Sequence, residues 1–517
     1  MAIKLSTQES SFRNELIFAS DAKAVKMDDV LINLFILLNY NGQRPKLRPV
    51  SGARGDLDLK QLQDRFSTLE EQNVVSGFDK YPEATEAWLR SNLVNMVNRG
   101  RPDKEKIASL RPIHLQSYRL RNARQSRDYN SADQVYLMLE RKPEVKQQLK
   151  EFLLEGWDAN TNQIDATRNL DVDSVGILHL VRKRKPDPLQ SSTGINRVKP
   201  ILTKQADLFC EDITRLLAYK NSIPRSVLLD YIKTIISFHL SLYLQILIHN
   251  LPQMLTAGTV EILNDWSFVV DMTGDLDSRI SELAIKDTEH TFNGIYDYIK
   301  ATYKINAALS KMGVDRSDSD RLNDALDSLA NRPDDFETYF QVMWNQHWQA
   351  SDSDERDLIN SFSKYEPSFF NKYIELILMK MGRYRYRYHT DLIDNLSGKN
   401  DERGFMVQGR SKKHPRRYVM GTRLIEALTQ ILLLEVENDQ FITQSISIEE
   451  LMEKLRNRYG LVINGIGEER FAEADVNTNL AFRENVEAFK HKLRQIGFYN
   501  DLSDAYILQK VRPRYEI

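Results

Sequence analysis

The densest chemical signal comes from cationic side chains in two segments near residue 400. Residues 382–389 read GRYRYRYH, in which arginine alternates with tyrosine. In a β-strand this alternation would place the arginines on one face and the tyrosines on the other. Arginine binds phosphate through paired donors and tyrosine stacks on exposed bases, so a strand here predicts a nucleic-acid contact through Arg383, Arg385 and Arg387. Two alternatives stay open: a half-buried strand with its tyrosines in the core, and a helix, in which both residue types spread around the axis.

The second cationic segment, residues 409–423, has the glycine and proline of a loop. From residue 410 onward it contains six lysines or arginines and no acid. Cations crowded in this way repel each other unless an anion neutralises them. We therefore expect the following residues to contact DNA phosphates: Arg410, Lys412, Lys413, Arg416 and Arg417. The alternatives are an acidic protein partner, the chain's own acidic region at residues 315–357, and a solvated loop.

The last hundred residues predict a winged-helix-like module. Three helical patterns and a pair of β-type runs follow one another at residues 424–437, 447–459, 481–496 and 498–511. Three helices followed by a hairpin is the order of a winged helix, and in helix-turn-helix proteins the recognition helix lies in the major groove. On the third helix, Lys490 and Arg494 are candidates for contacts to the groove or its phosphates. A polar insert between residues 460 and 479 departs from the compact form, and a plain helical cap is the alternative.

A metal-dependent nuclease is the enzymatic alternative. Asp133, Glu144 and Lys146 have a spacing similar to the D…ExK arrangement, in which two carboxylates hold a metal beside a lysine. That arrangement needs adjacent strands, whereas this segment predicts a helix, a proline and a second helix.

The sequence does not match the other common catalytic and metal-binding motifs. The acids at 315, 318 and 320 suggest calcium, but position 12 of an EF-hand loop beginning at 318 would be Leu329 instead of glutamate. The sequence contains no phosphate-binding P-loop, no dinucleotide fingerprint and no HExxH pair. We therefore expect no catalytic residue, no metal site and no cofactor.

The elements that would position the cationic residues are mainly α-helical. Helical periodicity dominates, and residues 174–181 (SVGILHLV) are the candidate for a short strand. We expect five parts: an N-terminal helical domain (1–160), a linker with the short strand (161–200), a central helical domain (201–380), the cationic segment (381–423) and the winged-helix-like domain (424–517).

Residues 228–251 are apolar enough to raise the question of a membrane span. Their length suits one, but Asp230 and Lys233 stand at one end and His239, Gln245 and His249 interrupt the rest. Apolar residues lie on all sides of this helix, which is typical of a core helix. We expect a buried helix and no membrane contact.

Composition sets the broad class. The chain has 517 residues, 71 lysines and arginines against 73 acids, and a single cysteine, Cys210. Near-neutral charge removes any argument from overall basicity, and one cysteine excludes a disulfide framework. The first residues lack a long apolar stretch behind a basic end, so we expect no signal peptide and a cytoplasmic protein.

Three features together resemble the helical accessory subunits of bacterial anti-phage systems: the helix SFHLSLYLQILIHNLP, the cationic loop, and the ending GFYNDLSDAYILQKVRPRYEI. Such subunits are encoded beside a HerA/FtsK-type ATPase, as in phosphorothioation-dependent restriction and methylation-associated defence. The resemblance implies a non-catalytic subunit that helps an ATPase–nuclease assembly engage invading DNA. An interaction scaffold without nucleic-acid binding is the second hypothesis, and the metal-dependent nuclease is the third.

Overall fold

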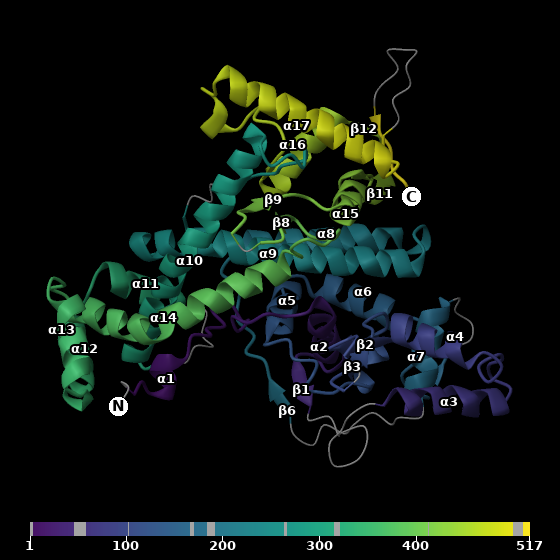
Figure 1. Cartoon of the computed structure of the whole chain (residues 1–517), viewed down its shortest axis with the longest axis horizontal. Coiled ribbons are helices and arrows are strands. Elements are labelled where there is room, and N and C mark those ends of the chain that lie inside the picture. The colour runs from purple at the N-terminus through teal and green to yellow at the C-terminus, as the bar shows by residue number, and fades with distance from the viewer. Residues whose placement is uncertain are drawn as a thin grey trace. The chain divides into compact units, whose positions relative to one another are not determined.

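The structure is a computed structural model of the whole chain, and it is mainly α-helical (Figure 1). It describes residues 4–45, 58–101, 103–165, 170–182, 192–262, 266–314, 321–411, 413–499 and 510–517. Within these residues there are seventeen α-helices, while the strands are two to five residues long and pair only in twos. The helical class expected from the sequence is confirmed.

The chain folds into two compact units. Unit 1 comprises residues 1–24, 197–208 and 237–514, and unit 2 comprises residues 25–196, 209–236 and 515–517. The division passes through two helices, α8 (Thr203–Ala218) and α9 (Arg225–Ala257). The five-part division expected from the sequence stays a prediction.

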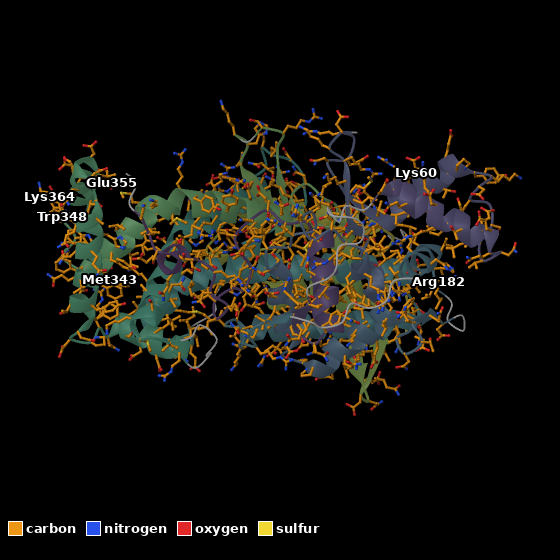
Figure 2. The ribbon with its side chains drawn as sticks, turned by 90° about the horizontal axis from the view of Figure 1, so that it is seen from below. Lys60, Arg182, Met343, Trp348, Glu355 and Lys364 are labelled. Carbon is orange, nitrogen blue, oxygen red and sulfur yellow. The ribbon has the colours of Figure 1, made fainter. Side chains whose placement is uncertain are left out.

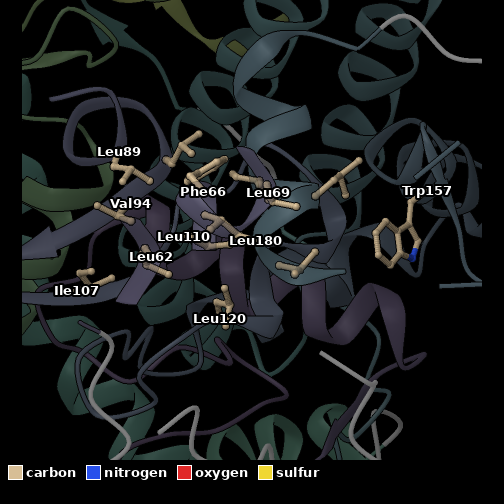
Figure 3. Close-up of a cluster of buried hydrophobic side chains, with 14 residues drawn as sticks. Leu62, Phe66, Leu69, Leu89, Val94, Ile107, Leu110, Leu120, Trp157 and Leu180 are labelled. Atoms are coloured by element: carbon tan, nitrogen blue, oxygen red, sulfur yellow. The ribbon is translucent and has the colours of Figure 1, made fainter. Parts of the chain in front are cut away.

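Unit 2 combines short helices with small antiparallel strand pairs. Its helices are α2 (Met27–Asn39), α3 (Leu59–Glu71), α4 (Pro82–Trp88), α5 (Ser131–Leu139), α6 (Pro143–Leu154) and α7 (Val172–Val181). Its strand pairs are β1 (Gln43–Pro45) with β6 (Ser192–Gly194), β2 (Val94–Val97) with β3 (Lys106–Leu110), and β4 (Trp157–Asp158) with β5 (Gln163–Ile164). A cluster of buried apolar side chains that includes Phe66, Leu110 and Leu180 holds α3, β3 and α7 together (Figure 3).

The expected strand at residues 174–181 is wrong, because these residues lie in helix α7. Asp171 caps that helix: its side chain accepts a hydrogen bond from the Ser174 backbone N–H, which satisfies a donor of the first turn. Gly176 then lets the helix approach the ring of Trp88, since a Cβ atom at this position would come within 2.6 Å of the indole. The apolar run is therefore the buried face of a helix.

Unit 1 is built on long helices. They are α10 (Arg279–Lys311), α11 (Arg321–Ala330), α12 (Phe336–Ala350), α13 (Ser353–Ser363) and α14 (Phe369–Leu396), preceded by the short α1 (Thr7–Ser10). Helix α14 packs against α10, α12 and α13. Trp348 lies on α12 and Glu355 on α13, and Lys364 directly follows α13 (Figure 2). There Arg356 lies over the Trp348 ring at 4.7 Å.

Helix α9 is long and apolar enough to cross a membrane by length and composition, and 89% of its most apolar window is buried inside the protein. Its polar groups are bonded inside the fold: the Ser237 hydroxyl donates to the Leu396 carbonyl, and Gln245 bonds Ser241 and Tyr418. Helix α9 is therefore a core helix, as the sequence predicted.

The C-terminal part of unit 1 mixes helices with short strands. Its elements are β7 (Phe268–Val269), β8 (Met406–Gln408), β9 (Arg416–Tyr418), α15 (Thr422–Leu432), β10 (Leu434–Glu437), β11 (Gln440–Thr443), β12 (Ile446–Ser447), α16 (Ile448–Tyr459), β13 (Leu461–Val462), α17 (Val476–Gln495) and β14 (Lys510–Val511). Strand β8 pairs with β9, β10 with β11, and β12 with β14, all antiparallel, while β13 runs parallel to β7.

The helix expected over residues 424–437 is too long. It ends at Leu432, and residues 434–437 form strand β10. Asn438 and Asp439 both have positive φ, 50° and 61°, which is the backbone of a two-residue hairpin turn. The apolar spacing would continue the helix to residue 437, but the turn at residues 438 and 439 lets residues 434–437 pair as a strand instead.

Candidate nucleic-acid interface

The arginine–tyrosine segment lies in helix α14 and not in a strand. Ser368 caps the helix, and apolar residues before and after the segment are buried along the same helix. The strand alternatives for this segment are wrong. In a helix, residues four apart share a face, whereas residues two apart point in nearly opposite directions.

This geometry separates the three arginines. Arg383 and Arg387 are exposed and four residues apart. Arg385 points inward, where its guanidinium donates to the Ser10 carbonyl at 3.0 Å and to the Tyr303 hydroxyl at 3.3 Å, and lies over the Phe12 ring at 5.2 Å. Arg385 thus fastens the N-terminal segment to α14, while the other two arginines remain available to a ligand.

Strands β8 and β9 form a hairpin, here called the cationic hairpin (residues 406–418), whose base is fixed by ion pairs. Arg416 forms a two-pronged pair with Asp394 of α14, with Nε–Oδ1 at 2.7 Å and Nη2–Oδ2 at 2.9 Å. Its guanidinium also lies over the Phe292 ring at 4.5 Å. The next residue, Arg417, is 9% exposed and pairs with the fully buried Asp271 at 2.9 Å.

Neutral hydrogen bonds add to this anchorage. Thr288 of α10 donates to the Arg416 carbonyl at 2.6 Å, and the buried Tyr418 hydroxyl bonds Thr291 and Gln245. Burial raises the pKa of Tyr418, which keeps this hydroxyl neutral. Arg416 and Arg417 are therefore structural in this arrangement, and their carboxylate partners lie outside the acidic region 315–357.

The tip of the cationic hairpin faces solvent. Arg410 and Lys413 are exposed, and Lys412 lies outside the described residues. The Ser411 hydroxyl accepts from the Lys413 backbone N–H at 3.2 Å, and Gln408 donates to the His414 carbonyl at 2.9 Å. The tip is thus a hydrogen-bonded turn that presents its cations from a fixed base.

Helix α17 carries the other two expected contacts. Lys490 pairs with Glu487 on the same helix at 2.9 Å, and Arg494 is exposed and lies over the Tyr499 ring at 5.3 Å. Buried Asn485 fixes the helix in place, since it donates to the Val270 and Ile463 carbonyls and accepts from the Met272 N–H. Lys490 is consequently partly neutralised by an acid of its own helix.

Sequence reasoning missed a cavity of about 900 Å³ between α16, residues 464–472 and α17. Its apolar lining includes Met452, Phe471 and Phe482, and its charged lining includes Glu449, Glu469 and Arg483. Ile466 beside it is 77% exposed. The separate positions of these residues along the chain gave no signal of a cavity.

The structure pairs two of the three residues of the nuclease hypothesis with other side chains. Asp133 is buried and paired with Arg44, Lys146 is paired with Glu140, and Glu144 is exposed at the start of α6. Over the described ranges, no group of three or more His, Cys, Asp or Glu residues could hold a metal ion. The calcium candidates at 315, 318 and 320 lie outside those ranges.

Comparison with known protein families identifies the family of this chain. A family model described as methylation-associated defense system protein MAD7 matches residues 7–515. The chain belongs to this family. The MAD7 match confirms the resemblance to a component of bacterial anti-phage defence that the sequence suggested. No curated protein matches the sequence.

Proposed function

We propose that this MAD7-family chain is a non-catalytic, cytoplasmic subunit that binds DNA for a methylation-associated defence system. The observation that carries the proposal is the cationic hairpin: Arg416 and Arg417 are held by buried or half-buried carboxylates, while Arg410 and Lys413 are exposed at its tip. A fixed base with exposed cations lowers the ordering cost of binding a phosphate backbone. Lys412, which lies outside the described residues, is the third expected phosphate contact of this segment of the sequence.

Helix α14 extends the same cationic surface. Arg383 and Arg387 precede Asp394, the residue that holds the hairpin, by eleven and seven positions. At about 100° per residue, all three lie on one face of the helix, and at about 1.5 Å of rise per residue the arginines are roughly 16 and 10 Å from Asp394 along the axis. Arg383 and Arg387 therefore lie on the face of α14 to which the cationic hairpin is attached, where they would add contacts to a nucleic-acid backbone held by the tip.

The winged-helix reading of the C-terminal module forms part of this proposal. Its support is the order of elements: α15, strand β12, helices α16 and α17, then an antiparallel bridge between Tyr499 and Val511, with β14 paired to β12. Helix α17 would be the recognition helix, with Arg494 on its exposed side. The expected hairpin at 498–511 lies mostly outside the described residues, because these exclude 500–509.

The interaction scaffold stays the second candidate, and the 900 Å³ cavity favours it. A mixed apolar and charged hollow of this size is typical of surfaces that receive a side chain or helix of another protein. A HerA/FtsK-type ATPase is the partner that the family resemblance suggests. One subunit could have both roles, since DNA would bind the exposed cations of the hairpin and of α14, and a partner protein would bind the cavity.

The salt dependence of DNA binding tests the proposal. Fluorescence anisotropy with a labelled duplex would compare the wild type with the variant Arg410→Ala/Lys412→Ala/Lys413→Ala. Each lost phosphate contact flattens the slope of log K against log salt by about 0.9, so we expect a change of roughly 2 to 3. The matched control replaces three exposed lysines of unit 2, Lys60, Lys104 and Lys220, with alanine and should leave the slope unchanged. An equal slope for the wild type and the tip variant would contradict the proposal.

A further inference from the structure

Exposed tyrosines lie on both sides of the two arginines that helix α14 presents to solvent. Tyr384 is 42% exposed and Tyr386 is 37% exposed. At about 100° per residue, Tyr384 lies roughly 60° from Arg387 around the helix on one side, and Tyr386 lies roughly 60° from Arg383 on the other. These four residues, here called the α14 strip, therefore form a row of cations with an aromatic ring along each edge.

Neither arginine of the α14 strip is neutralised by the part of the chain that the structure describes. No ion pair or hydrogen bond among those residues involves the guanidinium of Arg383 or Arg387, and that of Arg387 lies over the Tyr388 ring at 5.7 Å. The two arginines are one turn apart, about 6 Å along the axis, so they can contact neighbouring phosphates of one strand. Asp391, one turn beyond Arg387, ends the row of positive charge.

The tyrosine rings belong to small aromatic groups on each side of the helix. The Tyr384 ring contacts the Tyr388 ring, with centroids 4.4 Å apart and planes inclined at 52°. On the other side, Tyr296 of α10 is 42% exposed and lies against α14 at Gly382, where a Cβ atom would be 3.5 Å from its ring. Gly382 is one turn before Tyr386. A ring that its neighbours already hold loses less entropy when another ring stacks on it.

Positive charge beside exposed aromatic rings is the usual composition of surfaces that bind single-stranded nucleic acid. The cations follow the backbone, and the rings stack on the faces of the bases. In a duplex those faces are covered by the neighbouring base pairs, so the tyrosines would have no base to stack on. An acidic protein segment would account for the arginines and leave the rings without a role. The chemistry of the α14 strip therefore fits unpaired DNA.

We propose that the α14 strip binds a single-stranded segment of DNA. Arg383 and Arg387 contact neighbouring phosphates, while Tyr384 and Tyr386 stack on bases that turn to either side of the backbone. This inference rests on the proposed function and adds the form of DNA that this part of the surface binds. The exposed cations of the cationic hairpin contact phosphates of either form.

Fluorescence anisotropy on the full chain tests the inference at one salt concentration. The three labelled probes are oligothymidylate, an abasic strand and a blunt duplex, each about 16 nucleotides long. The abasic strand keeps every phosphate and lacks the bases, so its comparison with oligothymidylate isolates stacking. One stacked base contributes roughly 5- to 150-fold in affinity. We therefore expect the abasic strand to bind at least about 10-fold more weakly than oligothymidylate.

Variants locate the stacking to the α14 strip. Tyr384→Ala/Tyr386→Ala should weaken the binding of oligothymidylate by at least about 10-fold and leave the abasic strand and the duplex unchanged. Tyr384→Phe/Tyr386→Phe keeps both rings and should bind all three probes as the wild type does. The control Tyr365→Ala removes a tyrosine that follows α13 and is 84% exposed, and it should have no effect. Circular dichroism checks that each variant is folded, and if the alanine variant is not, the comparison of oligothymidylate with the abasic strand on the wild type decides.

The outcomes separate this inference from the proposed function. Equal affinity of the wild type for oligothymidylate and the abasic strand, or an alanine variant that binds oligothymidylate as the wild type does, would overturn the inference. The proposed function would stand in that case if the duplex still bound with the salt dependence described above. A chain that binds none of the three probes would overturn both.

Discussion

Asp394 on α14 and Arg416 on β9 form a two-pronged ion pair, with both N–O distances below 3 Å. Asp394 also accepts from Lys399, and its side chain is 11% exposed. One carboxylate thus pairs with two cations and joins the cationic hairpin to the helix that carries Arg383 and Arg387. Because Arg416 and Arg417 at the base of the hairpin are paired with carboxylates, these cations do not repel each other and the exposed tip is held in a defined position.

Removing this carboxylate should loosen the hairpin. Asp394→Asn leaves two partly buried cations without their counter-charge, so we expect a loss of about 1 to 3 kcal/mol in the free energy of unfolding. Urea denaturation measures the loss. The control Asp401→Asn replaces an exposed carboxylate and should change stability by less than about 0.5 kcal/mol. Equal stability of the two variants would show that the pair is unimportant.

Arg385 and Arg387 should respond to substitution in opposite ways. Arg385→Ala removes bonds to Ser10 and Tyr303 and should cost about 1 to 2 kcal/mol of stability, with DNA affinity unchanged. Arg387→Ala should leave stability within about 0.5 kcal/mol and weaken DNA binding. Thermal denaturation and anisotropy measured on both variants check this pair. A loss of DNA affinity in Arg385→Ala that matches that of Arg387→Ala would contradict the assignment of faces.

Glu9 should make the stability of unit 1 depend on pH in the acid range. Burial raises the pKa of Glu9, but hydrogen bonds from His347 and Ser6 outweigh it and lower the pKa to about 2. A carboxyl group with a lowered pKa stabilises the fold above its ordinary value of 4.5, and this contribution is lost as the pH falls from there toward 2.

Glu9→Gln should therefore be less stable than the wild type at pH 7, by at most about 2 kcal/mol because water reaches part of the site. The difference should shrink at pH 3, as followed by urea denaturation at both values. Glu71→Gln, at an exposed position, serves as the control. A difference that stays constant from pH 7 to pH 3 would refute the linkage.

Asp29 in unit 2 should act in the opposite direction. Burial raises its pKa, the nearby Lys26 lowers it less, and Asp28 and Asp128 raise it further, to about 7. The folded protein then keeps a proton that the unfolded chain loses near pH 4, so stability falls between pH 4 and pH 7. Asp29→Asn removes this dependence, which for a shift of this size amounts to roughly 3 kcal/mol. Unfolding experiments at pH 4.5 and pH 8 measure it. An equal fall in stability for Asp29→Asn would contradict the raised pKa.

The helical class and the core helix α9 could be predicted because both follow from local patterns of apolar residues. The secondary structure of the arginine–tyrosine segment could not be predicted, because alternation by itself also fits a strand. The residues before and after the segment form one capped helix with buried apolar side chains, and the segment continues that helix. The roles of Arg416 and Arg417 were also hidden, since their partners Asp394 and Asp271 are 22 and 146 positions away.

Site-specific photo-cross-linking tests the central claim most directly. A benzophenone side chain placed at Ser411, the exposed turn of the cationic hairpin, would be irradiated in the presence of a radiolabelled duplex. The same probe at Gln440, on the exposed β10–β11 hairpin, is the control. The account predicts covalent protein–DNA adducts from position 411 that disappear as salt rises, and few from position 440. Equal adduct yields at both positions, or none at 411 under conditions where the duplex is bound, would contradict it.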